Sequence, residues 1–129
     1  MIKLLTTYLA ANVAGTPALV VGTNLFAVWR PEEKADRSIL IQERSPGRAY
    51  EDGSKLIEKP FQISARSLDA FEARDDAFRI FDLLINKAGI DIGGGWTLQA
   101  ITGGEPFYMG MDSRDRHTYT LNLVMVMKH

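Results

Sequence analysis

Cysteine is absent from this 129-residue chain, and histidine occurs only at His117 and His129. Without cysteine the chain can form no disulfide bond, no thiolate metal site and no thiolate nucleophile. The two histidines are not spaced as metal ligands, and the metalloprotease sequence H-E-x-x-H does not occur. The composition therefore predicts no metal site and no cysteine chemistry.

An excess of charge of either sign is also lacking. The chain carries 15 Lys and Arg residues against 16 Asp and Glu residues, for a formal net charge of −1. A protein that holds nucleic acid by counterion release needs a basic surface. The charge balance therefore argues against a protein that reads nucleic-acid sequence.

Long uninterrupted apolar runs are missing, even in residues 1–29, where Lys3 is the only charged side chain. A membrane span needs ~20 predominantly apolar residues, and a signal peptide needs an unbroken apolar stretch of about 7–15 residues. Polar residues interrupt this segment, so we expect neither, and no membrane partner. Apolar residues recur instead at helical spacing, which predicts a first helix packed on the core. They are Ile2, Leu5, Leu9 and Val13.

Catalytic sequence patterns are missing as well. No G-x-S-x-G sequence marks a serine nucleophile. The glycines at 93–95 precede a predicted strand rather than a helix, which does not suit a phosphate-binding loop. Acidic residues of the second predicted helix alternate with Arg74 and Arg79, as on a solvated helix face. We therefore expect no catalytic residues, no cofactor and no enzymatic activity.

What the sequence does contain is a series of apolar stretches between turn residues, and these predict five strands. They cover residues 24–29, 38–44, 60–66, 96–101 and 118–127. The link between the first two, PEEKADR, is short and charged, which predicts an antiparallel hairpin. The last stretch becomes apolar on both faces toward its end, which predicts a central strand covered on both sides.

A second helix is predicted over residues 69–88. Asp69 and Glu72 have approximately the spacing of a capping box, and Gly89 suits the residue that follows a helix. One apolar stripe at helical spacing is predicted to face the core; it includes Phe71, Phe78, Phe81 and Ile85. The opposite side is predicted to face solvent; it includes Glu72, Asp75, Asp76 and Asp82.

These elements predict one α+β domain over residues 1–129. Their order is α-β-β-β-α-β-β, with a mostly antiparallel sheet packed by helices. The length fits a single domain, and no internal repeat occurs at a period of 20–50 residues.

The connection over residues 45–59 is longer than a hairpin requires, and connections of that length are often functional or disordered. It carries charges of both signs together with apolar side chains that a solvated loop has little use for. Our hypothesis is that the segment orders on assembly against a neighbouring subunit or partner; the alternative is a mobile surface loop. The candidate contacts are Arg48, Tyr50, Lys55, Leu56 and Ile57.

A second charged segment surrounds Asp115, which Arg114 and Arg116 flank. Two arginines at this spacing could hold a phosphate or contact a partner. A hairpin tip whose charges pair with one another is the other interpretation.

Four stretches carry a family resemblance: GTNLFAVWRPEE, SILIQERSPG, PFQISARS leading into DAFEARDDAFRIFDLL, and EPFYMGMDSRDRHTYTLNLVMVMK. Over roughly residues 22–127 the chain resembles the minor capsid and tail terminator (tail completion) proteins of long-tailed bacteriophages. In that family a proline–aromatic–glycine–aspartate segment precedes a final strand carrying an asparagine. The matching positions are Pro106, Tyr108, Gly110, Asp112 and Asn122.

The resemblance implies a structural virion protein with no catalytic residues. Such a protein forms a ring, usually a hexamer, that caps the tail tube and joins it to the neck or head-completion protein. Genomic DNA passes through the lumen without sequence-specific binding. The implied location is the tail–neck region of the virion, after assembly in the host cytoplasm.

Two alternatives remain open at this point. The first is another head–tail joining or tail-tube protein of the virion. The second is a small ferredoxin-like enzyme or ligand-binding module with a pocket between sheet and helix. That module would need polar groups facing inward, whereas the residues expected there are apolar; they are Phe61, Ile63, Phe78, Phe81, Leu121 and Leu123.

Overall fold

The structure is a computed structural model, and it describes residues 1–31, 36–50, 52–85 and 87–129. These ranges contain two helices, α1 (Ile2–Asn12) and α2 (Ala70–Leu84). They also contain eight strands, which are β1 (Leu25–Ala27), β2 (Ser38–Glu43), β3 (Arg48–Ala49), β4 (Leu56–Ser67), β5 (Ile90–Gly93), β6 (Trp96–Gly103), β7 (Phe107–Met111) and β8 (His117–Lys128).

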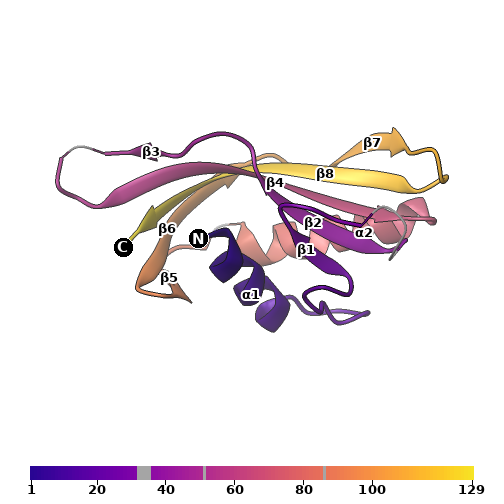
Figure 1. The fold of residues 1–129 in the computed structure, drawn as a ribbon, viewed down its shortest axis with the longest axis horizontal. Coiled ribbons are helices and arrows are strands. Elements are labelled where there is room, and N and C mark those ends of the chain that lie inside the picture. The colour runs from indigo at the N-terminus through magenta and orange to yellow at the C-terminus, as the bar shows by residue number, and fades with distance from the viewer. Residues whose placement is uncertain (32–35, 51, 86) are drawn as a thin grey trace.

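The strands form one sheet in the order β1-β2-β4-β8-β6-β5, with β3 added to β4 and β7 added to β8. At its centre β4 and β8 pair antiparallel along their whole length, from Leu56 opposite Lys128 to Ser67 opposite His117. Both helices lie on the same side of the sheet (Figure 1). The predicted α+β class and the mostly antiparallel sheet are therefore confirmed.

The core lies between the helices and one face of the sheet. Alternate residues of β4 and β8 turn toward the helices, because successive side chains of a strand point to opposite faces. The buried side chains of these strands include Phe61, Ile63, Leu121, Leu123, Met125 and Met127. From α1 the spacing of Leu5 and Leu9 brings both onto the core, so the prediction of a core-packed first helix is confirmed. Among the described residues, no helix is long and apolar enough to cross a membrane.

The helix α2 is rotated relative to the sequence-based prediction. The side chain of Asp69 caps it by accepting a hydrogen bond from the backbone N–H of Phe71 (2.8 Å). Phe71 itself is 77% exposed, so its predicted place in the core is wrong. Phe78 and Phe81 are only partly buried, in edge-to-face contact with each other. The residues of α2 that are buried are Ala73, Asp76, Ala77, Ile80 and Leu84.

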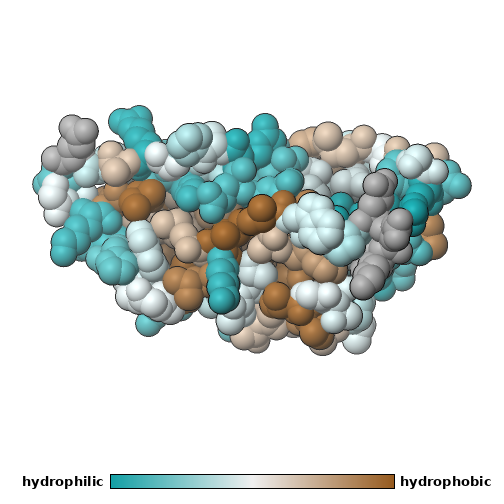
Figure 2. Space-filling view, viewed as in Figure 1, coloured by the Kyte–Doolittle hydropathy of each residue, from teal (hydrophilic) through white to brown (hydrophobic). Residues whose placement is uncertain are grey.

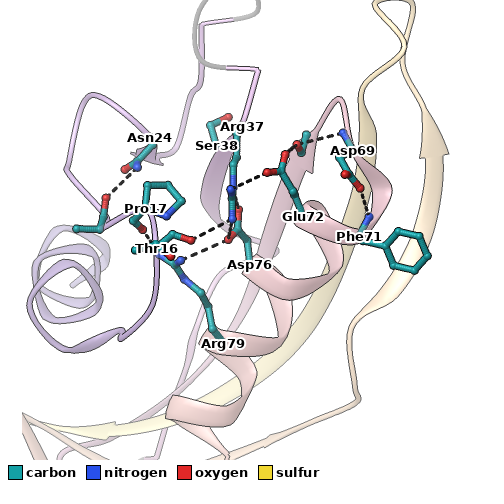
Figure 3. A network of polar contacts seen from close by, with 12 residues as sticks. Thr16, Pro17, Asn24, Arg37, Ser38, Asp69, Phe71, Glu72, Asp76 and Arg79 are labelled. Carbon is teal, nitrogen blue, oxygen red and sulfur yellow. Dashed lines mark hydrogen bonds and ion pairs between the residues drawn. The ribbon is translucent and has the colours of Figure 1, made fainter.

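Asp76 is the second difference on this helix, because it is 3% exposed where the prediction placed it in solvent. Arg37, just before β2, explains its burial: the guanidinium donates Nε–H to Asp76 Oδ2 (2.9 Å) and Nη1–H to Glu72 Oε2 (2.9 Å). The same guanidinium donates to the backbone carbonyl of Thr16 (3.2 Å), and Arg79 Nη1 lies 3.5 Å from Asp76 Oδ1. The network ties three segments distant in sequence to one another (Figure 3).

The pairing of β1 with β2 is parallel, with Leu25 opposite Ile39 and Ala27 opposite Ile41. The predicted antiparallel hairpin is therefore wrong. Val28 has a left-handed backbone (φ 70°), which turns the chain out of β1, and its N–H donates to the carbonyl of Ile41 (2.8 Å). Because β1 and β2 run in the same direction, the chain between Ala27 and Ser38 has to run back to the end of the pair where β1 begins, and its length allows this. Most of the link PEEKADR lies outside the described residues.

Candidate functional site

Residues 45–59 form a hairpin arm rather than an open loop. Within it β3 pairs with the start of β4, with Arg48 opposite Glu58 and Ala49 opposite Ile57. We call these residues, apart from Glu51, which is not described, the β3 arm. In Figure 1 the arm extends past both helices at one end of the sheet, so it has no helix beneath its tip.

Polar contacts within the β3 arm fix its shape. The hydroxyl of Tyr50 donates to Glu58 Oε2 (3.1 Å), and the guanidinium carbon of Arg48 lies 5.7 Å from the centre of the Tyr50 ring. The hydrogen bond to Glu58 and the charge of that carboxylate raise the pKa of Tyr50 above its ordinary value. At the turn, Asp52 Oδ1 accepts from the N–H of Ser54 (2.9 Å), and Lys55 adopts a left-handed backbone (φ 59°).

The arm's apolar side chains divide between the surface and the sheet. Tyr50 is exposed, whereas Leu56 and Ile57 are partly buried where β4 runs beside β8, opposite Lys128 and Met127. Lys55 is exposed beside the turn. The arm therefore presents mainly Arg48, Tyr50 and Lys55 to an approaching partner, while the two aliphatic residues are partly buried beside β8.

The turn between β7 and β8 pairs its own charges. Arg116 is buried: its Nε donates to Asp112 Oδ2 (2.8 Å), and its Nη1 lies 3.7 Å from Asp36 Oδ1. Asp112 Oδ1 also accepts the backbone N–H groups of Arg114 and Arg116 (2.9 and 3.0 Å). Burial alone raises the pKa of Asp112, but these hydrogen bonds and the charge of Arg116 outweigh it and hold that pKa below its ordinary value. Arg114 is exposed.

The structure does not bring the two predicted contact regions together. The β3 arm lies at the end of the central pair where Leu56 meets Lys128, and the 112–116 turn adjoins the other end, where Ser67 meets His117. At about 3.4 Å per residue, strands of this length hold the two regions roughly 35 Å apart. One partner surface would have to be large to contact both regions of the same copy.

Three arginines gather on the sheet face that carries no helix, a cluster that the sequence analysis missed. Arg30 donates to the carbonyls of Ser38 and Ser64 (3.4 Å each), and Arg66 donates to the carbonyl of Pro31 (2.9 Å). Burial, followed by the charges of Arg66 and Arg116, lowers the pKa of Arg30 to about 10. These contacts tie the segment after β1 to the sheet. No local sequence pattern could indicate the cluster, because its members come from distant parts of the chain.

The middle of this open face carries a row of neutral amide side chains. Gln42, Gln62 and Asn122 occupy one register row across β2, β4 and β8. Arg44 donates to Asn122 Oδ1 (3.1 Å), beside an open hollow of about 460 Å³. The hollow is lined by Arg44, Ser45, Pro60, Phe61, Thr102, Gly103, Asn122, Leu123 and Val124. With Arg44 as its one titratable side chain among those residues, this hollow offers no acid–base pair.

The segment that carried the family resemblance follows the edge of the sheet. Gly110 has a positive φ (109°) beside a bulge between Tyr108 and Gly110, a backbone conformation that favours glycine. Tyr108 Oη lies 2.8 Å from Nδ1 of His117 on β8. Within the described residues, no group of three or more His, Cys, Asp or Glu side chains is placed to hold a metal ion.

Comparison with known proteins shows a likeness to a solved structure. No protein-family model and no curated protein sequence matches the chain. Among solved structures it is similar to a chain of one described as "Virion of native gene transfer agent (GTA) particle", with a TM-score of 0.69 and 17% sequence identity. The match covers 98% of this chain and 94% of that chain. At this level of identity, what the likeness shows is a shared fold over nearly the full length of both chains.

Proposed function

We propose that the chain is a structural protein of a virion or virion-like particle. The observation that carries the proposal is the fold likeness to a chain of a gene transfer agent virion, which covers nearly all of both chains. The resemblance of residues 22–127 to tail terminators also supports it, because that resemblance rests on sequence motifs rather than on the fold. No enzymatic activity forms part of the proposal.

Within the particle we propose the role of tail terminator. The chain assembles in the host cytoplasm into a ring, taken as a hexamer, that caps the tail tube and joins it to the neck or head-completion protein. Genomic DNA passes through the lumen without sequence-specific binding. The near-neutral net charge of the chain (−1) suits such a passage, since a strongly basic wall would retain DNA by counterion release.

In this proposal the β3 arm contacts the neighbouring subunit or the tube. Arg48, Tyr50 and Lys55 supply its exposed surface, and Leu56 and Ile57 supply partly buried apolar area next to its turn. At the opposite end Arg114 is exposed and available for contact, whereas the buried Arg116 holds the 112–116 turn in shape.

The test is to image the purified protein by negative stain and to locate it in particles by immunogold labelling. Single rings in solution and label at the head–tail junction are expected. Label along the whole tail would assign the chain to the tail tube instead. Absence of the chain from purified particles would refute the proposal.

A further inference from the structure

The edge strand β7 exposes apolar side chains on both faces of the sheet. We call Phe107, Tyr108, Met109 and Met111 the β7 patch; each of these side chains is between 45% and 58% exposed. No charged residue occurs from Pro106 to Met111. Monomeric proteins seldom leave four large apolar neighbours in solvent, and such patches often bind other proteins.

A second apolar surface surrounds β1. We call Val20, Val21, Val28 and Trp29 the β1 patch; their exposed fractions run from 51% to 71%, the highest being that of Trp29. Figure 2 shows hydrophobic residues reaching the surface around this strand. A largely exposed tryptophan is notable because tryptophan is enriched among the residues that dominate protein interfaces.

The two patches lie on opposite edges of the sheet at the same level. One register row crosses five strands: Leu25 pairs with Ile39, Ile39 with Ala65, Ala65 with Tyr119, and Tyr119 with Tyr108. Since β4 occupies one side of β8, β7 lies on the other side, away from β1. With neighbouring strands about 4.8 Å apart, the row holds the two edges roughly 19 Å from each other.

Two unlike patches on opposite edges fit a repeated head-to-tail contact. A two-fold dimer buries the same patch on both subunits, whereas a heterologous contact joins two different patches and closes into a ring if the rotation allows. We propose that the β7 patch of one copy docks on the β1 patch of the next copy. The expectation of a ring comes from the proposed function, on which this inference rests. The inference names the two surfaces that join neighbouring subunits of that ring.

The patches have the size of an interface centre. Four side chains that are about half exposed offer at most about 400 Å² per patch, taking 150–250 Å² for an aromatic side chain and less for each valine and methionine. A standard interface buries about 800 Å² per partner, with an apolar core and a polar rim. The patches therefore supply roughly half of that area, and the polar residues around them supply the rim.

Side-chain packing, not an added strand, makes the contact. The outer edge of β1 is already bonded, because Gly22 N–H donates to the carbonyl of Leu25 (2.9 Å) and Leu25 N–H to the carbonyl of Val20 (3.2 Å). On β7 the bulge at Tyr108 and Gly110 breaks the ladder, as bulges do on edges that avoid strand addition. The unbranched methionines can adapt to the shape of the tryptophan of the neighbour.

Cross-linking through introduced cysteines tests this arrangement, since the natural chain has none. Val28→Cys and Met109→Cys place one thiol in each patch at exposed positions. With a short bismaleimide, the double variant should give a ladder of covalent oligomers. Each single variant should stay monomeric on the denaturing gel, and an equimolar mixture of the two should stop at dimer. A matched control joins Val28→Cys to Asp82→Cys, which is exposed on α2, and should give no ladder.

A second measurement uses Trp29→Ala, which should raise the dissociation constant of the assembly at least 30-fold in sedimentation experiments. Asp82→Ala should leave that constant unchanged, and both variants should melt within a few degrees of the natural chain. Cross-linking of Met109→Cys alone, no ladder from the double variant, or a natural chain that stays monomeric at every concentration would overturn the inference. Label at the head–tail junction together with rings that form without these two patches would leave the proposed function standing.

Discussion

Substitution of Asp76 measures how strongly the buried charge network holds α2 to the rest of the fold. Asp76→Ala removes the carboxylate that accepts from Arg37 (2.9 and 3.1 Å), and it leaves Arg37 and Arg79 without the negative charge between them. Arg79 also holds the carbonyl of Pro17 (2.6 Å), so the segment before β1 loses support as well. Breaking a fully buried ion pair costs about 3–5 kcal/mol.

The expected loss for Asp76→Ala is about 2–4 kcal/mol, below that full range, because the side chain of Arg37 is part-exposed and keeps Glu72 as a partner. Asp75→Ala is the matched control: Asp75 is the exposed neighbour on the same helix turn, and its loss should change stability by no more than about 0.5 kcal/mol. Both variants gain the same helix propensity from alanine, so the comparison cancels that contribution.

The assay is urea unfolding followed by circular dichroism, with the m-value required to stay constant between variants. A loss of about 3 kcal/mol should lower the Tm by roughly 10 °C in a chain of this size. A double-mutant cycle of Asp76→Ala with Arg37→Ala should reveal a coupling of at least about 1 kcal/mol. Equal effects of the Asp75 and Asp76 variants, or additive effects in the cycle, would refute the reasoning.

Three further predictions follow from burial and hydrogen bonding. Phe61→Ala should cost about 3–5 kcal/mol in urea unfolding because Phe61 is fully buried, whereas Phe71→Ala should cost no more than about 0.5 kcal/mol; the reverse order would contradict the observed rotation of α2. Replacing residues 49–54 by a Gly-Ser turn should leave the Tm within a few degrees and abolish rings in negative stain; intact rings would remove the β3 arm from the assembly proposal. Because the folded-state pKa of Asp112 lies below its unfolded value of 3.8, its contribution to stability is complete above pH 3.8 and lost as the pH falls through the folded value. The stability difference between the natural chain and Asp112→Asn should therefore be constant from pH 7 to about 5 and shrink only in stronger acid, as pH-dependent unfolding would measure.

The long elements could be predicted from sequence because each carries its own periodic pattern. Phe61, Ile63 and Ala65 alternate along β4 as the core face requires, and Leu5 and Leu9 have the helical spacing that buries both. The short strands β3, β5 and β7 could not be predicted in this way. Each contains two to five residues, and it becomes a strand by pairing with a longer neighbour rather than through its own sequence.

The errors on α2 and on the β1–β2 pair share a physical cause. The sequence pattern treats a carboxylate as a solvent-facing group, but Asp76 is buried because Arg37, far away in sequence, supplies the compensating charge. The direction of β1 depends on the backbone of Val28 at the end of the strand, and a β-branched residue gives no warning of a positive φ. In both places a contact distant in sequence outweighed the local preference.

Of the candidate contacts, the sequence located the β3 arm but not its shape. Its mixed charges and apolar residues marked residues 45–59 as unusual, whereas the hairpin pairing of Arg48 with Glu58 required the structure. For Arg116 the sequence was less informative, because the charge pattern of residues 112–116 cannot distinguish an exposed arginine from one that is buried against Asp112. The β7 and β1 patches were missed because apolar residues in short segments are ordinarily assigned to the core.

The central pairing of β4 with β8 also determines how slowly the chain can reach its native state. Leu56 meets Lys128 and Ser67 meets His117, so the middle of the sheet joins residues separated by 72 and 50 positions along the chain. Closing loops of that size costs conformational entropy before any core contact forms to offset it. We therefore expect the folding time to lie in the range of roughly milliseconds to seconds that is typical of folds with many contacts between distant residues. During that interval β7 lacks its strand partner, since it pairs with β8, and β6 can pair only with the short β5. Stopped-flow refolding should therefore show β8 substitutions slowing the main phase more than substitutions in α1 of equal equilibrium cost.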